Sequence, residues 1–101
     1  MYLFQILLPR TDNSGKPFPK KEYHQIKEEL ATQFEGVTAY LRAPAEGLWR
    51  QGAKSAHDDI VIFEVMADQI DLAAWRSRRA QLEHRFRQNE IVIRYLSVHI
   101  V

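Results

Sequence analysis

Cysteine is absent from this 101-residue sequence. The chain therefore has no disulfide, no thiolate nucleophile, no iron–sulfur cluster and no cysteine-type zinc site. Long apolar runs are absent too, and the apolar start at residues 1–9 lacks the basic residues and the small-residue cleavage site of a signal peptide. These absences predict a cytoplasmic protein without a membrane partner.

An excess of charge of one sign is also lacking, since 14 lysines and arginines stand against 13 aspartates and glutamates. The net charge of +1 gives no overall attraction to nucleic acid, so such binding requires a local patch. Residues 59–65 lack the basic, glycine and paired-aromatic pattern with which RNA-recognition strands stack bases, so we predict no nucleic-acid partner. One segment does concentrate arginine, which we interpret as a solvated helix face: Arg76, Arg78, Arg79, Arg85 and Arg87.

Motifs of the common catalytic and cofactor sites are missing as well. The sequence contains no Walker loop, no HExxH, no nucleophile elbow and no GxGxxG. Its four histidines lack metal-ligand spacing, and a pair such as His24 and Glu28, four residues apart on a helix, is common on protein surfaces. We therefore predict no metal and no permanent cofactor, and the sequence assigns no catalytic residue.

The sequence does contain an ordered series of strand and helix patterns. Apolar runs and alternation predict strands at residues 2–8, 37–43, 60–66 and 91–100. An apolar stripe with helical spacing follows Pro19 and ends at Gly36, and a second helical pattern covers residues 68–88. With 46% hydrophobic residues, the chain has material for one core, so we expect a single domain over residues 1–101.

The order βαββαβ predicts an α+β fold of the ferredoxin-like type. Two split βαβ units with right-handed crossovers interleave into a four-stranded antiparallel sheet of order 4-1-3-2. Both helices then cover the same face of the sheet. The first and third strands lie at its centre.

The opposite face of this sheet is predicted to be apolar as well. In the first strand, for example, Phe4 and Ile6 alternate with Leu3 and Leu7. Four strands of about five residues give a face of roughly 300 Å², which is about the largest apolar patch that a monomer exposes. We therefore predict a homodimer that stacks these faces, in the manner of a dimeric α/β barrel.

Polar residues interrupt the apolar pattern of this second face. Arg94, Gln5 and Glu64 are predicted to align across neighbouring strands, with Tyr40 and Arg42 on the outer strand. One interpretation is a mutually satisfied network that fixes the register of the dimer. The other is the polar floor of a ligand pocket, in which an arginine holds an acid group.

Residues 44–58 are predicted to form a long connection. A loop of this length is uncommon unless it binds a ligand, closes a site or exchanges with a partner. Gly47 and Gly52 flank Trp49 and Arg50, which is compatible with a lid. The alternative is that Trp49 packs against the helix layer or a second copy while Arg50 is solvated.

These features favour a homodimer that binds a small molecule without a permanent cofactor. The alternative is a cofactor-independent enzyme that acts through His57 or His99, and a third possibility is a regulatory or structural interaction protein. The candidate ligand-binding residues are Tyr40, Arg42, Trp49, Arg50, His57, Glu64 and Arg94.

Residues 34–40, 42–49 and 86–94 resemble an uncharacterised family of small bacterial ferredoxin-like proteins of about this length. More distantly, the chain is similar to dimeric α/β-barrel proteins, which include cofactor-independent monooxygenases and isomerases. The resemblance implies the fold, a bacterial source and a dimer. It carries over no catalytic residue.

Overall fold

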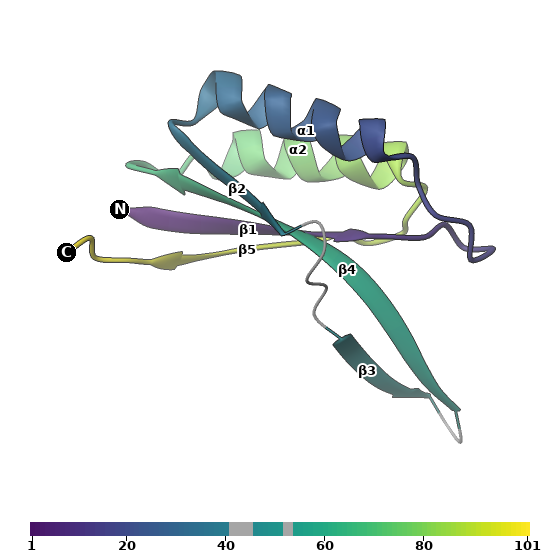
Figure 1. Ribbon diagram of the computed structural model, residues 1–101. Helices are drawn as coiled ribbons and strands as arrows, with labels where there is room; N and C mark the ends of the chain where they lie inside the picture. The colour runs from purple at the N-terminus through teal and green to yellow at the C-terminus, as the bar shows by residue number, and fades with distance from the viewer. Residues whose placement is uncertain (41–45, 52–53) are drawn as a thin grey trace.

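The computed structural model describes residues 1–40, 46–51 and 54–101, with side chains for residues 1–38 and 60–101. The described chain contains five strands and two helices, and three of the strands follow one another between the helices (Figure 1). Their bounds are β1 Tyr2–Pro9, α1 Lys20–Gln33, β2 Gly36–Tyr40, β3 Glu46–Gln51, β4 Lys54–Ala67, α2 Leu72–Arg85 and β5 Val92–Ser97.

The main sheet has the order β2-β4-β1-β5, and its neighbouring strands are antiparallel. Without β3, these are the second, third, first and fourth strands of the chain, which is the predicted order 4-1-3-2 counted from the opposite edge. Both helices cover one face of the sheet (Figure 1). The ferredoxin-like prediction is therefore confirmed.

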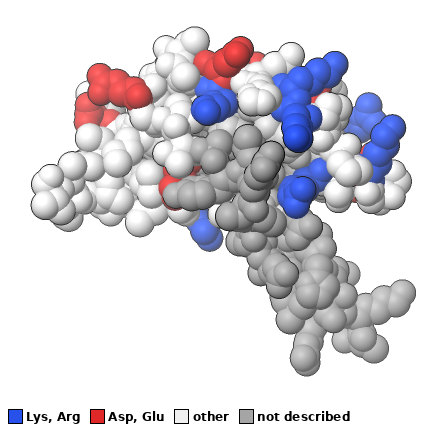
Figure 2. Space-filling model, viewed as in Figure 1, with Lys and Arg blue, Asp and Glu red and all other residues white. Residues whose placement is uncertain are grey.

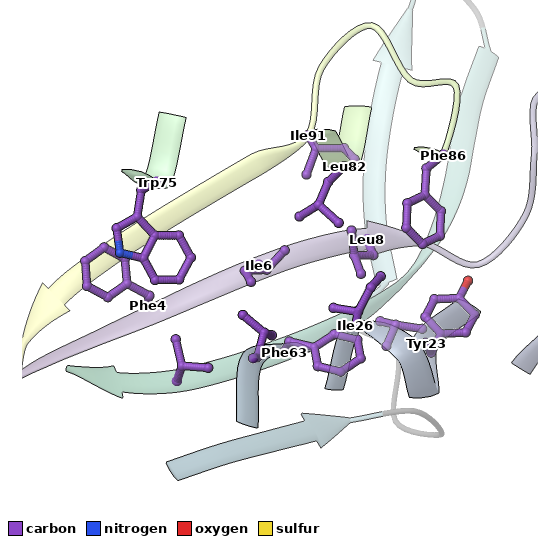
Figure 3. Packing of buried hydrophobic residues seen from close by; sticks show 13 residues of the cluster. Phe4, Ile6, Leu8, Tyr23, Ile26, Phe63, Trp75, Leu82, Phe86 and Ile91 are labelled. Carbon is purple, nitrogen blue, oxygen red and sulfur yellow. The ribbon is translucent and has the colours of Figure 1, made fainter. Parts of the chain in front are cut away.

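The core lies between the helices and the sheet. Alternate residues of the two central strands point to the helices, as the sequence pattern requires, and Phe4, Ile6 and Phe63 are fully buried (Figure 3). Figure 3 shows Trp75 of α2 lying over Phe4, and their rings stack with centroids 4.2 Å apart. The helix layer adds further buried residues from both helices and the turn after α2: Tyr23, Ile26, Leu30, Trp75, Leu82 and Phe86.

The second helix is shorter than the predicted residues 68–88 because both of its ends are capped. Asp71 precedes the helix, and its side chain accepts a hydrogen bond from the Ala74 N–H at 3.1 Å. After the helix, the N–H groups of Arg87 and Gln88 donate back to carbonyls of the last turn, and Arg87 adopts a φ of 53°. This is a Schellman motif, which ends the helix before residue 88.

The predicted connection at residues 44–58 is wrong, because most of it is a β-hairpin. β3 pairs with the first half of β4, in a register that joins Glu46 to Asp59 and Gln51 to Lys54. The first half of β4 reads Lys-Ser-Ala-His-Asp-Asp, without alternating apolar residues. An alternation signal arises where one face of a strand is buried, and this ribbon does not pair with β1.

Candidate functional site

The candidate site is the face of the sheet opposite the helices, which we call the open face. Neither helix covers it (Figure 1). Met66, Val92 and Leu96 on this face are 37%, 47% and 45% exposed. The described apolar residues of the open face are Leu3, Leu7, Ile60, Ile62, Met66, Val92 and Leu96.

A row of polar side chains crosses the middle of the open face. The strand register places Thr38 opposite Glu64, Glu64 opposite Gln5, and Gln5 opposite Arg94. The Gln5 amide links the two charged ends: its Nε2 donates to Glu64 Oε2 at 2.7 Å, and its Oε1 accepts from Arg94 Nε at 2.7 Å. The predicted alignment of Arg94, Gln5 and Glu64 is therefore confirmed. We call these three residues, with Thr38, the polar row.

The bridging amide keeps the two opposite charges of the polar row apart. In the described part of the chain, Arg94 forms no ion pair, and its Nε–H donates a hydrogen bond to the Gln5 side chain. Gln5 and Glu64 are half-buried, whereas Arg94 is exposed. The row thus has a positive end on β5 and a negative end on β4.

The open face continues into a hollow of about 830 Å³ at the negative end of the polar row. Leu3 and Met66 supply apolar lining, and Glu35, Glu64 and Asp68 supply carboxylates. Arg94 is not part of this lining. The acidic hollow and the arginine therefore mark opposite ends of one surface.

The other predicted site residues lie where side chains are not described. Tyr40 pairs with Ile62 at the outer edge of the open face. Trp49 and Arg50 belong to β3. Arg42 lies outside the described residues, and its prediction stays untested.

Two histidines named as possible catalytic residues do not belong to the polar row. His57 lies in the hairpin half of β4, opposite Leu48. His99 follows the end of β5 and is exposed. Gln5, by contrast, bridges Glu64 and Arg94 but was missing from the candidate ligand residues, although its place in the strand register was the available signal.

A second hollow, of about 690 Å³, lies where the β1–α1 connection meets α1. Arg10, Lys20 and His24 line it together with Tyr23, whose hydroxyl donates to the Pro9 carbonyl at 2.6 Å. Figure 2 shows lysine and arginine side chains gathered toward this end of the molecule. Because its lining comes from the helix side of the sheet, this hollow is separate from the open face.

The arginine segment predicted as a solvated face is partly engaged within the fold. Arg85 Nη1 lies 2.9 Å from Glu29 Oε2 on α1. The Arg78 guanidinium donates a hydrogen bond to the Gln33 side chain of α1 and lies 5.3 Å from the centroid of the Phe34 ring, and burial lowers the pKa of Arg78. These two arginines therefore fasten α2 to its neighbours.

No protein-family model matches this chain, and searches of curated proteins and of solved structures found no match. Neither helix of the described chain is long and apolar enough to cross a membrane. Among the described residues, no three histidine, aspartate or glutamate side chains group as metal ligands.

Proposed function

We propose that this protein is a homodimer that binds a small acidic molecule between the open faces of its two copies, without a permanent cofactor. One observation carries this proposal. An uncovered apolar sheet face is crossed by a hydrogen-bonded polar row, and the row ends in an arginine that forms no ion pair among the described residues.

The apolar residues of the open face supply the driving force for pairing. Met66, Val92 and Leu96 remain more than a third exposed in a single chain, on a sheet that is otherwise well packed. An apolar patch of this kind, rimmed by polar residues, is typical of an interaction surface. A second copy is the natural partner, because a two-fold axis matches one such face with another.

The charges of the polar row make the open face complementary to itself. A two-fold axis running along β1 brings the β5 side of one copy over the β4 side of the other. The positive end of each row then faces the negative end of the other, where Glu35, Glu64 and Asp68 lie. Such complementarity favours one register over its alternatives.

Arg94 supports the binding of an acidic ligand in this dimer. A guanidinium enclosed between two apolar faces is costly unless an anion pairs with it, and either a bound acid or a carboxylate of the facing copy fills that role. Its planar fork of N–H groups fits a carboxylate or phosphate with two parallel hydrogen bonds. β4 bends strongly along its length, so two such faces enclose a cavity more readily than they stack flat (Figure 1).

A thermal-shift screen of small carboxylates and phosphate esters tests the proposal. A ligand at ten times its dissociation constant is expected to raise Tm by about 5–10 °C in a domain of this size. The Arg94→Gln variant is expected to lose this shift, because the amide keeps a donor toward Gln5 but removes the positive charge. Arg79→Gln, at an exposed position on α2, is the matched control and is expected to keep the shift.

Two results would contradict ligand binding at Arg94. In one, no acid stabilises the protein at millimolar concentration. In the other, Arg94→Gln and Glu64→Gln weaken the dimer equally and leave every ligand shift unchanged. That second pattern would mean that Arg94 pairs with Glu64 of the partner subunit, so that the polar row fixes only the register of the dimer.

A further inference from the structure

The hairpin formed by β3 and the first half of β4 is not needed to complete the sheet. β4 pairs with β1 from Ile60 to Ala67, whereas its residues from Lys54 to Asp59 pair with β3. We call residues 46–51 and 54–59 the arm. The arm extends a central strand of the sheet beyond the core by six residues.

The arm stands away from the rest of the chain. Figure 1 shows it projecting past the sheet on the side opposite the helices, which is the side of the open face. The longest dimension of the molecule is 43 Å against 26 Å for the other two, and its radius of gyration is 14.3 Å. A compact domain of about 100 residues has a radius of gyration of about 13 Å.

A projecting two-stranded ribbon is at best marginally stable in water. β3 packs against β4, and no other described element gives it comparable support. The arm sequence nevertheless includes Leu48 and Trp49, and tryptophan is the residue type most enriched among the anchors of protein interfaces. These facts indicate that the arm has a docking surface outside its own chain.

We propose that the arm docks on the body of a second copy, so that each copy of the dimer holds the other. This inference rests on the proposed homodimer, because it takes the open faces as the centre of the contact. The arm already lies on the side on which the second copy would sit (Figure 1). The partner that docks against the arm is therefore another molecule of this protein.

The area that a stable interface buries supports the inclusion of the arm in the contact. A stable protein interface buries about 800 Å² on each partner. The open face alone offers roughly 300 Å². Two strands of six residues form a ribbon of about 20 Å by 10 Å, or roughly 200 Å². Each copy contributes its own arm to the interface and also contacts the arm of its partner, so the contact area on each copy rises to about 700 Å². With the arms, the interface approaches the size of a stable one.

Engineered cysteines test this arrangement cleanly, because the chain has none of its own. One preparation carries Ser55→Cys in the arm, and a second carries Val92→Cys on the open face, at the end of the sheet nearer the arm. The two are mixed at micromolar concentration, allowed to exchange and treated with a short bismaleimide. Every product between unlike chains is intermolecular, and mass spectrometry identifies it.

The arm–face pair is expected to cross-link about 1000-fold faster than free thiols at micromolar concentration, because docked sites meet at effective concentrations in the millimolar range. Ser55→Cys mixed with Arg79→Cys on α2 is the matched control and is expected to react at the slow rate. Leu96→Cys mixed with Met66→Cys reports the contact between open faces, because Leu96 and Met66 both lie opposite Leu3 and a two-fold axis along β1 brings one over the other.

The outcomes separate the two proposals. Fast arm–face cross-linking supports the docked arm. Fast cross-linking of Leu96→Cys to Met66→Cys with slow arm–face reaction overturns the arm proposal and leaves the homodimer standing. Slow reaction of every pair overturns both proposals.

Discussion

Asp12 organises the connection between β1 and α1. Its Oδ1 accepts hydrogen bonds from the Ser14 N–H at 2.9 Å, the Ser14 hydroxyl at 2.8 Å and the Lys16 N–H at 2.9 Å. The bond from the Lys16 backbone, followed by that from the Ser14 hydroxyl, lowers the pKa of Asp12 below its ordinary value of 3.8. The charged form of Asp12 therefore stabilises the folded chain.

We predict that Asp12→Asn lowers the free energy of unfolding at neutral pH and that this loss shrinks in acid. The folded pKa is lowered, so the advantage of the wild type is fully present above pH 3.8 and is lost as the pH falls through the folded value. Urea unfolding of both proteins over a pH series measures the difference. Glu28→Gln is the control, because Glu28 is exposed on α1 and its carboxylate accepts no hydrogen bond among the described residues. A difference that stays constant into acid would contradict the prediction.

At the scale of the element, the two helices begin in different ways. α1 starts after Pro19 and has no side-chain cap, whereas α2 is capped by Asp71. We predict that Asp71→Ala reduces the free energy of unfolding by about 1 kcal/mol, the usual effect of losing an N-cap. Denaturant unfolding at one fixed protein concentration measures it, since association also shifts stability.

Asp71→Asn provides the matched control for the cap. Asparagine removes the same charge but keeps a side-chain oxygen that accepts the hydrogen bond from the Ala74 N–H. Equal losses from both substitutions would show that the charge near the helix start matters, and not the cap. A loss confined to Asp71→Ala is the expected result.

The helices and strands that could be predicted from the sequence are those with one face buried in the core. The strands of the main sheet alternate because Phe4 and Phe63 face the helices, and that alternation also placed Gln5, Glu64 and Arg94 in one row. The arm escaped prediction because nothing within its own chain selects an apolar pattern there. The amide bridge at Gln5 was foreseen only in general form, as one of two interpretations of the aligned polar residues, since alternation fixes the register of a side chain and not its hydrogen bonds.

The proposed dimer depends on the contact between the two open faces. We predict that Leu96→Glu raises the dimer dissociation constant at least 100-fold, because a buried charge without a partner costs about 3–5 kcal/mol. Light scattering and analytical ultracentrifugation over a range of concentrations measure the constant. Far-UV circular dichroism is expected to stay unchanged, since Leu96 is 45% exposed in the single chain.

Leu72→Glu is the matched control for this prediction. Leu72 is 40% exposed, close to the value for Leu96, but it lies in the first turn of α2, on the helix side of the sheet. A glutamate there is also compatible with the helix dipole. If the two substitutions weaken the dimer equally, the contact does not run through the open face. If the wild type is a monomer at every accessible concentration, there is no dimer to explain, and the apolar open face needs a different partner.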